Sequence, residues 1–76
     1  MKKKLSHIDK FKACIIQSID SNDNDVTEEL ETLGFVPGTE VTVMNKSFLS
    51  GPLTVMLRGA KIAIRQRQAD IIAVSA

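Results

Sequence analysis

The sequence predicts a mostly β domain, a small closed or nearly closed barrel of about five strands with one short helix. Three observations predict this fold class. Five short runs of alternating aliphatic residues are separated by turn-forming residues. The chain has 76 residues, which is enough for one small domain with a modest core. It has no Trp or Tyr and only three Phe, so small aliphatic side chains must fill that core.

The predicted strands alternate in the manner of half-buried β-structure. In the first strand, Cys14 and Ile16 share one face, while Ala13, Ile15 and Ile19 share the other. The short connections of the second half fit an SH3-like barrel, in which closure removes exposed sheet edges. The expected strands are 12–19, 39–44, 53–57, 61–65 and 71–74, with a tight connection at 59–60 and short turns or helical turns at 5–9 and 66–70.

One helix is predicted over residues 26–33. Asp25 precedes it as an N-cap whose carboxylate accepts hydrogen bonds from free main-chain amides, and Glu28 completes a capping box. Val26, Leu30 and Leu33 recur at i, i+4 and i+7, so they form one apolar stripe.

The stretch after this helix encodes a helix end, a turn and the next strand. Gly34 suits the left-handed residue that ends a helix, and Phe35 is placed to close on Leu30 as in a Schellman motif. Pro37 and Gly38 supply a fixed φ followed by a permissive one, which suits a type II turn. We interpret these residues as architectural; the set is Leu30, Leu33, Gly34, Phe35, Pro37 and Gly38.

Charge is distributed unevenly, although the net charge is only +1. Residues 13–45 hold seven of the nine acidic residues and no Lys or Arg, whereas basic residues dominate from Lys46 onward. The favoured interpretation is a solvated acidic helix beside basic strands, and the alternative is a bipolar surface that steers a charged partner. Lys2–Lys4 is interpreted as a solubilising tail, because three lysines are a weak signal for an anionic membrane.

Cysteine content and hydropathy predict a cytoplasmic protein. Cys14 is the only cysteine, so no internal disulfide can form. The basic start is not followed by the apolar run of a secretion signal, and no segment reaches the roughly 20 apolar residues of a membrane span. We therefore expect no direct membrane insertion.

Residues suited to catalysis or metal binding are scarce. Cys14 is expected to pack in the core and His7 to lie at the surface, and no third group is spaced to complete a nucleophilic site. We therefore predict no enzymatic activity. Residues 20–25 resemble the opening of a calcium loop but lack its glycine and its bidentate Glu. Glutamates of the helix with His7 form at most an adventitious metal site.

Two kinds of recognition remain. Basic side chains of the second half could contact phosphates, but no aromatic residues are interleaved with them for base stacking. Phe48 and Leu49 lie in a predicted loop, where they either fold back over the barrel mouth or form an exposed apolar anchor with the acidic helix as its polar rim. The basic residues are Arg58, Lys61, Arg65 and Arg67. The candidate partner-binding residues are Glu28, Glu29, Phe48, Leu49, Pro52 and Arg58.

The stretch 30–41, Leu-Glu-Thr-Leu-Gly-Phe-Val-Pro-Gly-Thr-Glu-Val, resembles the core motif of the FeoA family, small bacterial accessory proteins of ferrous-iron uptake. Later blocks resemble the family in order and spacing: Pro52, Arg58-Gly59, 62–65 and 69–74. The resemblance covers almost the whole chain and implies a single SH3-like domain over residues 1–76, with its core at about 5–75. It also implies a partner, the cytosolic GTP-binding domain of the membrane iron transporter FeoB. Transition metals such as iron are associated with the family, without a ligand set that maps onto this sequence.

Three positions depart from the family pattern. Glu29, preceded by Glu28, stands where a basic residue is common. Phe11 stands where a glycine commonly precedes the first strand, and Gly51 replaces the usual acidic residue before Pro52. These departures indicate a divergent member with an altered partner contact.

Three functions therefore stand as hypotheses. The first is a non-enzymatic module that binds FeoB and is recruited by it to the inner face of the membrane. The second is a metal-responsive regulatory module, because similar barrels occur at the C-terminus of iron-dependent repressors. The third and least favoured is a small nucleic-acid-binding barrel; no nucleic-acid partner is expected under the first. The opposed charges also allow self-association.

Overall fold

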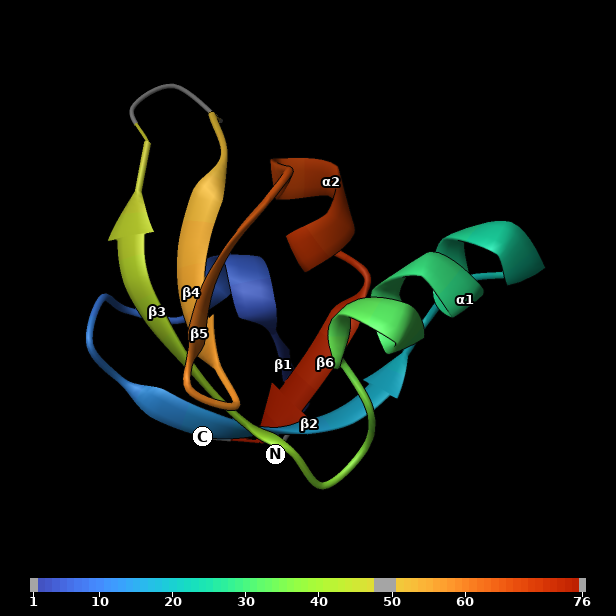
Figure 1. The fold of residues 1–76 in the computed structure, drawn as a ribbon, viewed down its shortest axis with the longest axis horizontal. Helices are drawn as coiled ribbons and strands as arrows, with labels where there is room; N and C mark the ends of the chain where they lie inside the picture. Colours follow the sequence, from blue (N-terminus) through green and yellow to red (C-terminus); the bar gives the residue numbers. More distant parts are fainter. Residues whose placement is uncertain (1, 48–50, 76) are drawn as a thin grey trace.

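The computed structural model describes residues 2–47 and 51–75. Its six strands form one antiparallel sheet in the order β1-β6-β2-β3-β4-β5 (Figure 1). The strands are β1 (Lys2–Lys4), β2 (Ala13–Ile19), β3 (Glu40–Lys46), β4 (Leu53–Leu57), β5 (Ala60–Ile64) and β6 (Ile72–Ser75). The helical elements are η1 (Leu5–His7), α1 (Asn24–Leu33) and α2 (Gln66–Ala69). The mostly β architecture with one short helix is thus confirmed, and strand ends differ from the prediction by at most two residues.

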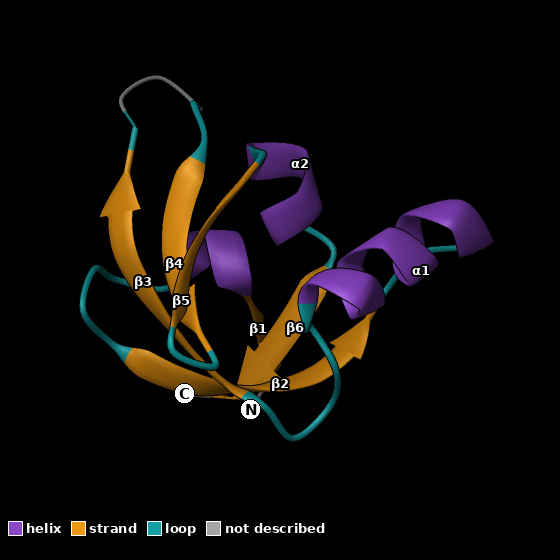
Figure 2. Cartoon of the chain, in the orientation of Figure 1, coloured by secondary structure: helices purple, strands orange, loops and turns teal. Residues whose placement is uncertain are grey.

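The sheet curves around an aliphatic core. In Figure 2, α2 lies beside the upper end of β5, and α1 lies to the right of the strands. Alternate residues of β4 are buried, and Val41 and Val43 of β3 are buried in the same way. Among the described residues of the core, Phe35 is the one aromatic side chain, so aliphatic packing dominates there as predicted. The core residues are Leu5, Ile8, Cys14, Ile16, Leu30, Phe35, Val41, Val43, Leu53, Val55, Leu57, Ile64, Ala69, Ile72 and Val74.

The sixth strand, β1, was not predicted. Lys2–Lys4 was interpreted as a tail, yet it pairs antiparallel with β6, and Lys3 lies opposite Val74. All three lysines remain exposed, so the run has no apolar face that could have revealed a strand. The run is a strand because its main-chain groups pair with those of β6, about 70 residues away in the sequence.

A β-bulge in β2 corrects the predicted face of Ile19. The register between β2 and β6 shifts between Ile16 and Ser18, which adds one residue on the β2 side. Strict alternation would place Ile19 with Ile15 on the outer face. After the bulge, Ile19 is partly buried and packs against the core, while Ile15 stays 36% exposed.

The helix α1 begins two residues earlier than predicted, and its cap is a different aspartate. Asp23, not Asp25, is the N-cap: its side chain accepts from the main-chain N–H groups of Asp25 and Val26 at 2.9 and 3.4 Å. Asp25 lies within the first turn, so the predicted capping box with Glu28 is wrong. Both aspartates carry a carboxylate that could cap a helix. Because α1 begins at Asn24, Asp23 occupies the N-cap position.

The end of α1 confirms the predicted Schellman motif. Gly34 has φ +113, its N–H donates to Glu31 O at 3.0 Å, and the Phe35 N–H donates to Leu30 O at 3.0 Å. Leu30 and Phe35 are both fully buried. Leu33, however, is 42% exposed, so it does not belong to the apolar stripe that faces the core.

Two tight turns follow from positive φ angles. Gly38 has φ +91 and the Thr39 N–H donates to Val36 O at 3.2 Å, as in the predicted type II turn. The β4–β5 hairpin turns at Arg58 and Gly59, whose φ angles are +52 and +82, one residue before the predicted connection at 59–60. Positive φ at both central residues is typical of a type I′ hairpin turn.

A partly buried polar contact joins the two ends of the chain. The Ser6 Oγ donates to Asp70 Oδ1 at 2.5 Å, and Lys46 Nζ donates to the Ser6 carbonyl at 3.3 Å. These bonds connect η1 with the end of α2 and with β3. No helix in the described part of the chain is both long and apolar enough to cross a membrane.

Candidate functional site

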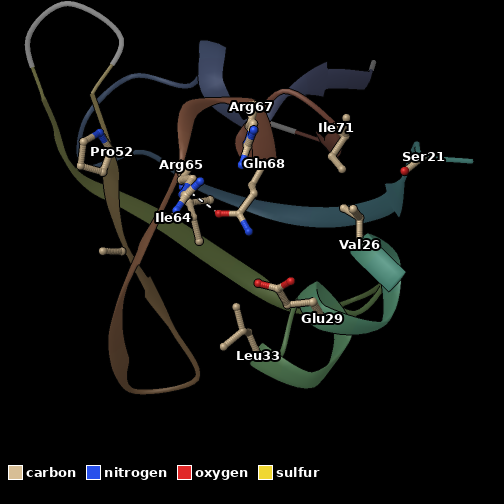
Figure 3. Close-up of a pocket in the computed structure, with 11 residues that line it drawn as sticks. Ser21, Val26, Glu29, Leu33, Pro52, Ile64, Arg65, Arg67, Gln68 and Ile71 are labelled. Carbon is tan, nitrogen blue, oxygen red and sulfur yellow. Dashed lines mark hydrogen bonds between the residues drawn. The ribbon is translucent and has the colours of Figure 1, made fainter. Parts of the chain in front are cut away.

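An open cleft of about 860 Å³ lies between α1 and the corner where β5 leads into α2 (Figure 3). Its lining is half apolar and half polar in character. The apolar residues are Val26, Leu33, Pro52, Ala63, Ile64 and Ile71. The polar residues are Ser21, Glu29, Arg65, Arg67 and Gln68. Mixed lining of this kind suits a peptide or protein surface more than a fully enclosed small ligand.

The helix wall of the cleft consists of Val26, Glu29 and Leu33. These residues are spaced i, i+3 and i+7, which places them on one face of α1. The buried face of the same helix holds Leu30. Leu33 therefore presents its side chain to the cleft, which explains why this aliphatic residue is 42% exposed.

The opposite wall is held by hydrogen bonds at the start of α2. The Arg65 N–H donates to Gln68 Oε1 at 2.8 Å, and the Gln68 N–H donates to Arg65 O at 3.0 Å. This reciprocal arrangement fixes the corner between β5 and α2 (Figure 3). The guanidinium groups of Arg65 and Arg67 belong to exposed residues beside it.

Opposite charges stand on the two walls. Glu29 lies on the helix side with other acidic residues of α1 nearby, whereas Arg65 and Arg67 lie across from it. Figure 3 shows Glu29 on the α1 side and Arg65 on the β5 side of the space. The uneven charge of the sequence thus becomes a boundary between acidic and basic surface that runs through the cleft.

The predicted partner-binding residues are only partly brought together. Glu29 and Pro52 line the cleft. Glu28 lies on a neighbouring exposed face of α1, where a separate shallow depression is lined by Asp25, Glu28, Glu29, Glu31 and Thr32. Arg58 lies in the β4–β5 turn, where its Cδ would be 3.6 Å from a Cβ built on Gly34. Phe48 and Leu49 lie outside the described residues, so their interpretation stays a prediction.

Several residues of the cleft were missed by sequence reasoning as partner contacts. Arg65 and Arg67 were considered only as phosphate contacts, and Leu33 only as a core residue. Ala63 and Gln68 carry no local signal, because only the tertiary fold places them opposite α1. The i, i+3, i+7 spacing of Val26, Glu29 and Leu33 was the one signal that could have indicated this face.

Cys14 packs in the core, and His7 lies at the surface. Cys14 is 3% exposed and its Sγ donates to Val41 O at 3.5 Å, which confirms the predicted core position. Burial raises the pKa of the Cys14 thiol, and Glu40 adds to this against the opposing effect of Lys12. His7 is exposed at the end of η1. Within residues 2–47 and 51–75, no three His, Cys, Asp or Glu side chains cluster as metal ligands would.

Comparisons with known proteins agree with this geometry. The FeoA domain family model matches residues 3–76. FeoA of Stenotrophomonas maltophilia, solved with zinc and described as a prokaryotic SH3 domain protein, is 26% identical with a TM-score of 0.82, covering 99% of this chain and 89% of that one. The FeoA protein of Chlorobium tepidum is 26% identical with a TM-score of 0.85, covering 95% of this chain and 68% of that one.

A different class of protein shares the fold. A manganese-dependent transcriptional repressor in complex with manganese is 16% identical with a TM-score of 0.90, covering 97% of this chain and 36% of that one. At this identity the likeness shows the fold alone. Comparison with curated protein sequences finds no match.

The bent antiparallel sheet with its lateral helix defines a small SH3-like domain, and the open, two-sided cleft is typical of a recognition surface. The match to the family model identifies the domain more narrowly. The chain belongs to the FeoA domain family, whose members are small accessory proteins of ferrous iron transport.

Proposed function

We propose that this chain is a non-enzymatic accessory protein of bacterial ferrous iron uptake that binds the cytosolic part of a FeoB-type transporter. The observation that carries the proposal is the cleft between α1 and β5, which combines aliphatic side chains with opposite charges. Membership of the FeoA family supports the partner's identity. The relative from S. maltophilia, proposed to act as a ferrous iron transport activating factor, points the same way.

The aliphatic residues of the cleft are the natural anchors for such a partner. Leu33 is 42% exposed, and the partly buried Val26 lies about two turns before it on the same face of α1. Covering an exposed leucine with partner atoms removes apolar surface from water, which is worth about 25 cal/mol per Å² before association costs. The charged rim then determines orientation and the rate of association more than affinity.

The proposal includes a location. A protein bound to the cytosolic domain of a membrane transporter acts in the cytoplasm, at the inner face of the membrane. Lys2–Lys4 are exposed on the edge strand β1, so they remain accessible to a charged surface in that position. Binding itself is attributed to the cleft.

The test is a titration of this chain with the purified GTP-binding domain of the transporter, with Leu33→Lys as the cleft variant. Ile15→Lys is the matched control, because Ile15 is 36% exposed and lies on β2 outside the cleft. We expect Leu33→Lys to weaken binding by about ten-fold or more. The control should bind as the wild type does, and equal losses in both variants would count against the cleft.

The repressor likeness does not support a metal-sensing function for this chain. Its described residues hold no three-residue ligand cluster, and the acidic side chains of α1 lie along an exposed helix surface. No step of the proposed function passes through a bound metal; iron enters as the cargo of the partner. Calorimetry with ferrous or manganous ion tests the alternative, and saturable binding would revive it.

A further inference from the structure

The strand β5 forms a free edge of the sheet. Among the described residues it pairs only with β4, and it stands at the end of the strand order opposite β1. Edge strands offer unpaired main-chain donors and acceptors, which proteins commonly protect with charged side chains. The β1 edge is protected in this way, since it consists of three exposed lysines. The β5 edge has a single lysine, the exposed Lys61, and also contains Ala63, which lines the cleft.

The hairpin register determines which main-chain groups of β5 are free. Leu57 and Ala60 flank the two-residue turn, so they form a hydrogen-bonded pair, and such pairs alternate along an antiparallel ladder. Ala60, Ile62 and Ile64 therefore direct their N–H and C=O groups toward β4. Those of Lys61 and Ala63 point away from β4, and both residues are exposed.

The free edge of β5 ends at Arg65, whose main-chain groups are already hydrogen-bonded. The Arg65 N–H donates to Gln68 Oε1, and the Arg65 carbonyl accepts from Gln68 and Ala69 at 3.0 and 3.1 Å. The main chain of Arg65 is thus already satisfied, which limits the available ladder to Lys61 and Ala63. Across the cleft stands the α1 wall, with Leu33 exposed toward it (Figure 3).

We propose that an extended segment of the partner adds to β5 as a seventh strand, with its main chain bonded to Lys61 and Ala63. Alternate side chains of that segment would enter the cleft, where an aliphatic residue packs on Leu33. An acidic residue of the segment meets the exposed guanidinium groups of Arg65 and Arg67, whose charge it complements. This inference rests on the proposed function, since the segment belongs to the cytosolic part of the transporter.

The test uses Ala63→Pro and Ala63→Val in this chain, titrated with the transporter's purified GTP-binding domain. Proline removes an N–H group that does not bond β4, so an edge position of this kind tolerates it, whereas valine keeps the donor. We expect Ala63→Pro to weaken binding by about ten-fold or more and Ala63→Val by less than about three-fold. Hydrogen exchange of the wild-type chain is the second measurement, in which the amides of Lys61 and Ala63 become protected on binding.

The possible outcomes distinguish a failure of the strand addition from a failure of the proposed function. Equal binding by the two Ala63 variants, or unprotected Lys61 and Ala63 amides in the complex, overturns the strand addition and leaves the proposed function standing. No binding by the wild type overturns both. A wild-type dimer in sedimentation that Ala63→Pro dissociates would assign the edge to a second copy of this chain, which also overturns the inference.

Discussion

Replacing Gly34 by alanine tests how α1 is held against the sheet. At φ +113 the substitution strains the backbone, which costs an L-residue about 1–2 kcal/mol. The added Cβ would also lie 3.2 Å from Leu57 Cδ2, and Leu57 is 1% exposed within the core. Overpacking of this kind adds about 1–3 kcal/mol. We therefore expect Gly34→Ala to lower the free energy of unfolding by about 2–5 kcal/mol.

Gly38→Ala is the matched control, because Gly38 also has a positive φ, +91, but a Cβ there would meet no atom within 4 Å. Its loss should be the backbone contribution alone, about 1–2 kcal/mol. Urea denaturation followed by circular dichroism measures both variants. In thermal unfolding each kcal/mol corresponds to about 4–8 °C in Tm for a domain of this size. Equal losses at Gly34 and Gly38 would refute the steric part of the reasoning, and an unaffected Gly34→Ala would refute all of it.

Three further predictions concern single polar or ionisable groups. Asp23→Ala should cost about 1 kcal/mol in urea denaturation and Asp25→Ala less; the reverse order would restore Asp25 as the cap. Ser6→Ala should cost about 1.5–3 kcal/mol, because Asp70 loses a charge-assisted hydrogen bond, and an unchanged midpoint would show that water replaces it. Burial raises the pKa of Cys14 above its value in the unfolded chain, so this thiol's contribution to stability is complete below about pH 8.5 and is lost as the pH rises through the folded value. Cys14→Ala should remove that alkaline loss from midpoints measured between about pH 7 and 10, and an identical pH profile would contradict it.

The elements predicted correctly are those encoded by neighbouring residues. Gly34, Phe35 and Gly38 specify a helix end and a turn through their own backbone preferences, and the structure has both. Alternation likewise located five strands to within two residues. In each case the decisive interactions span only a few residues, so the sequence pattern contains them.

The elements missed depend on distant partners. β1 exists because β6 pairs with it, and the bulge that turns Ile19 inward depends on the same neighbour. The cleft forms where α1 faces β5 and α2. Leu33 and Ala63 therefore line the same surface, although no sequence motif links them. Local chemistry predicts the type of an element, whereas its edges and exposed faces are set by what packs beside it.

At Phe11 the backbone conformation is held by a main-chain hydrogen bond, while the side chain lies at the surface. The Phe11 backbone has a φ of +68, in the left-handed region that glycine adopts most readily. The strain of about 1–2 kcal/mol is tolerated because the Phe11 N–H is held by Val43 O at 2.6 Å. The side chain is 66% exposed, so its burial does not offset that strain. It contacts Lys10, whose Nζ lies 5.0 Å from the ring centroid. The turn is therefore held by its hydrogen bond to β3. The conformation at Phe11 thus depends on its main-chain partner in β3 and not on burial of its side chain.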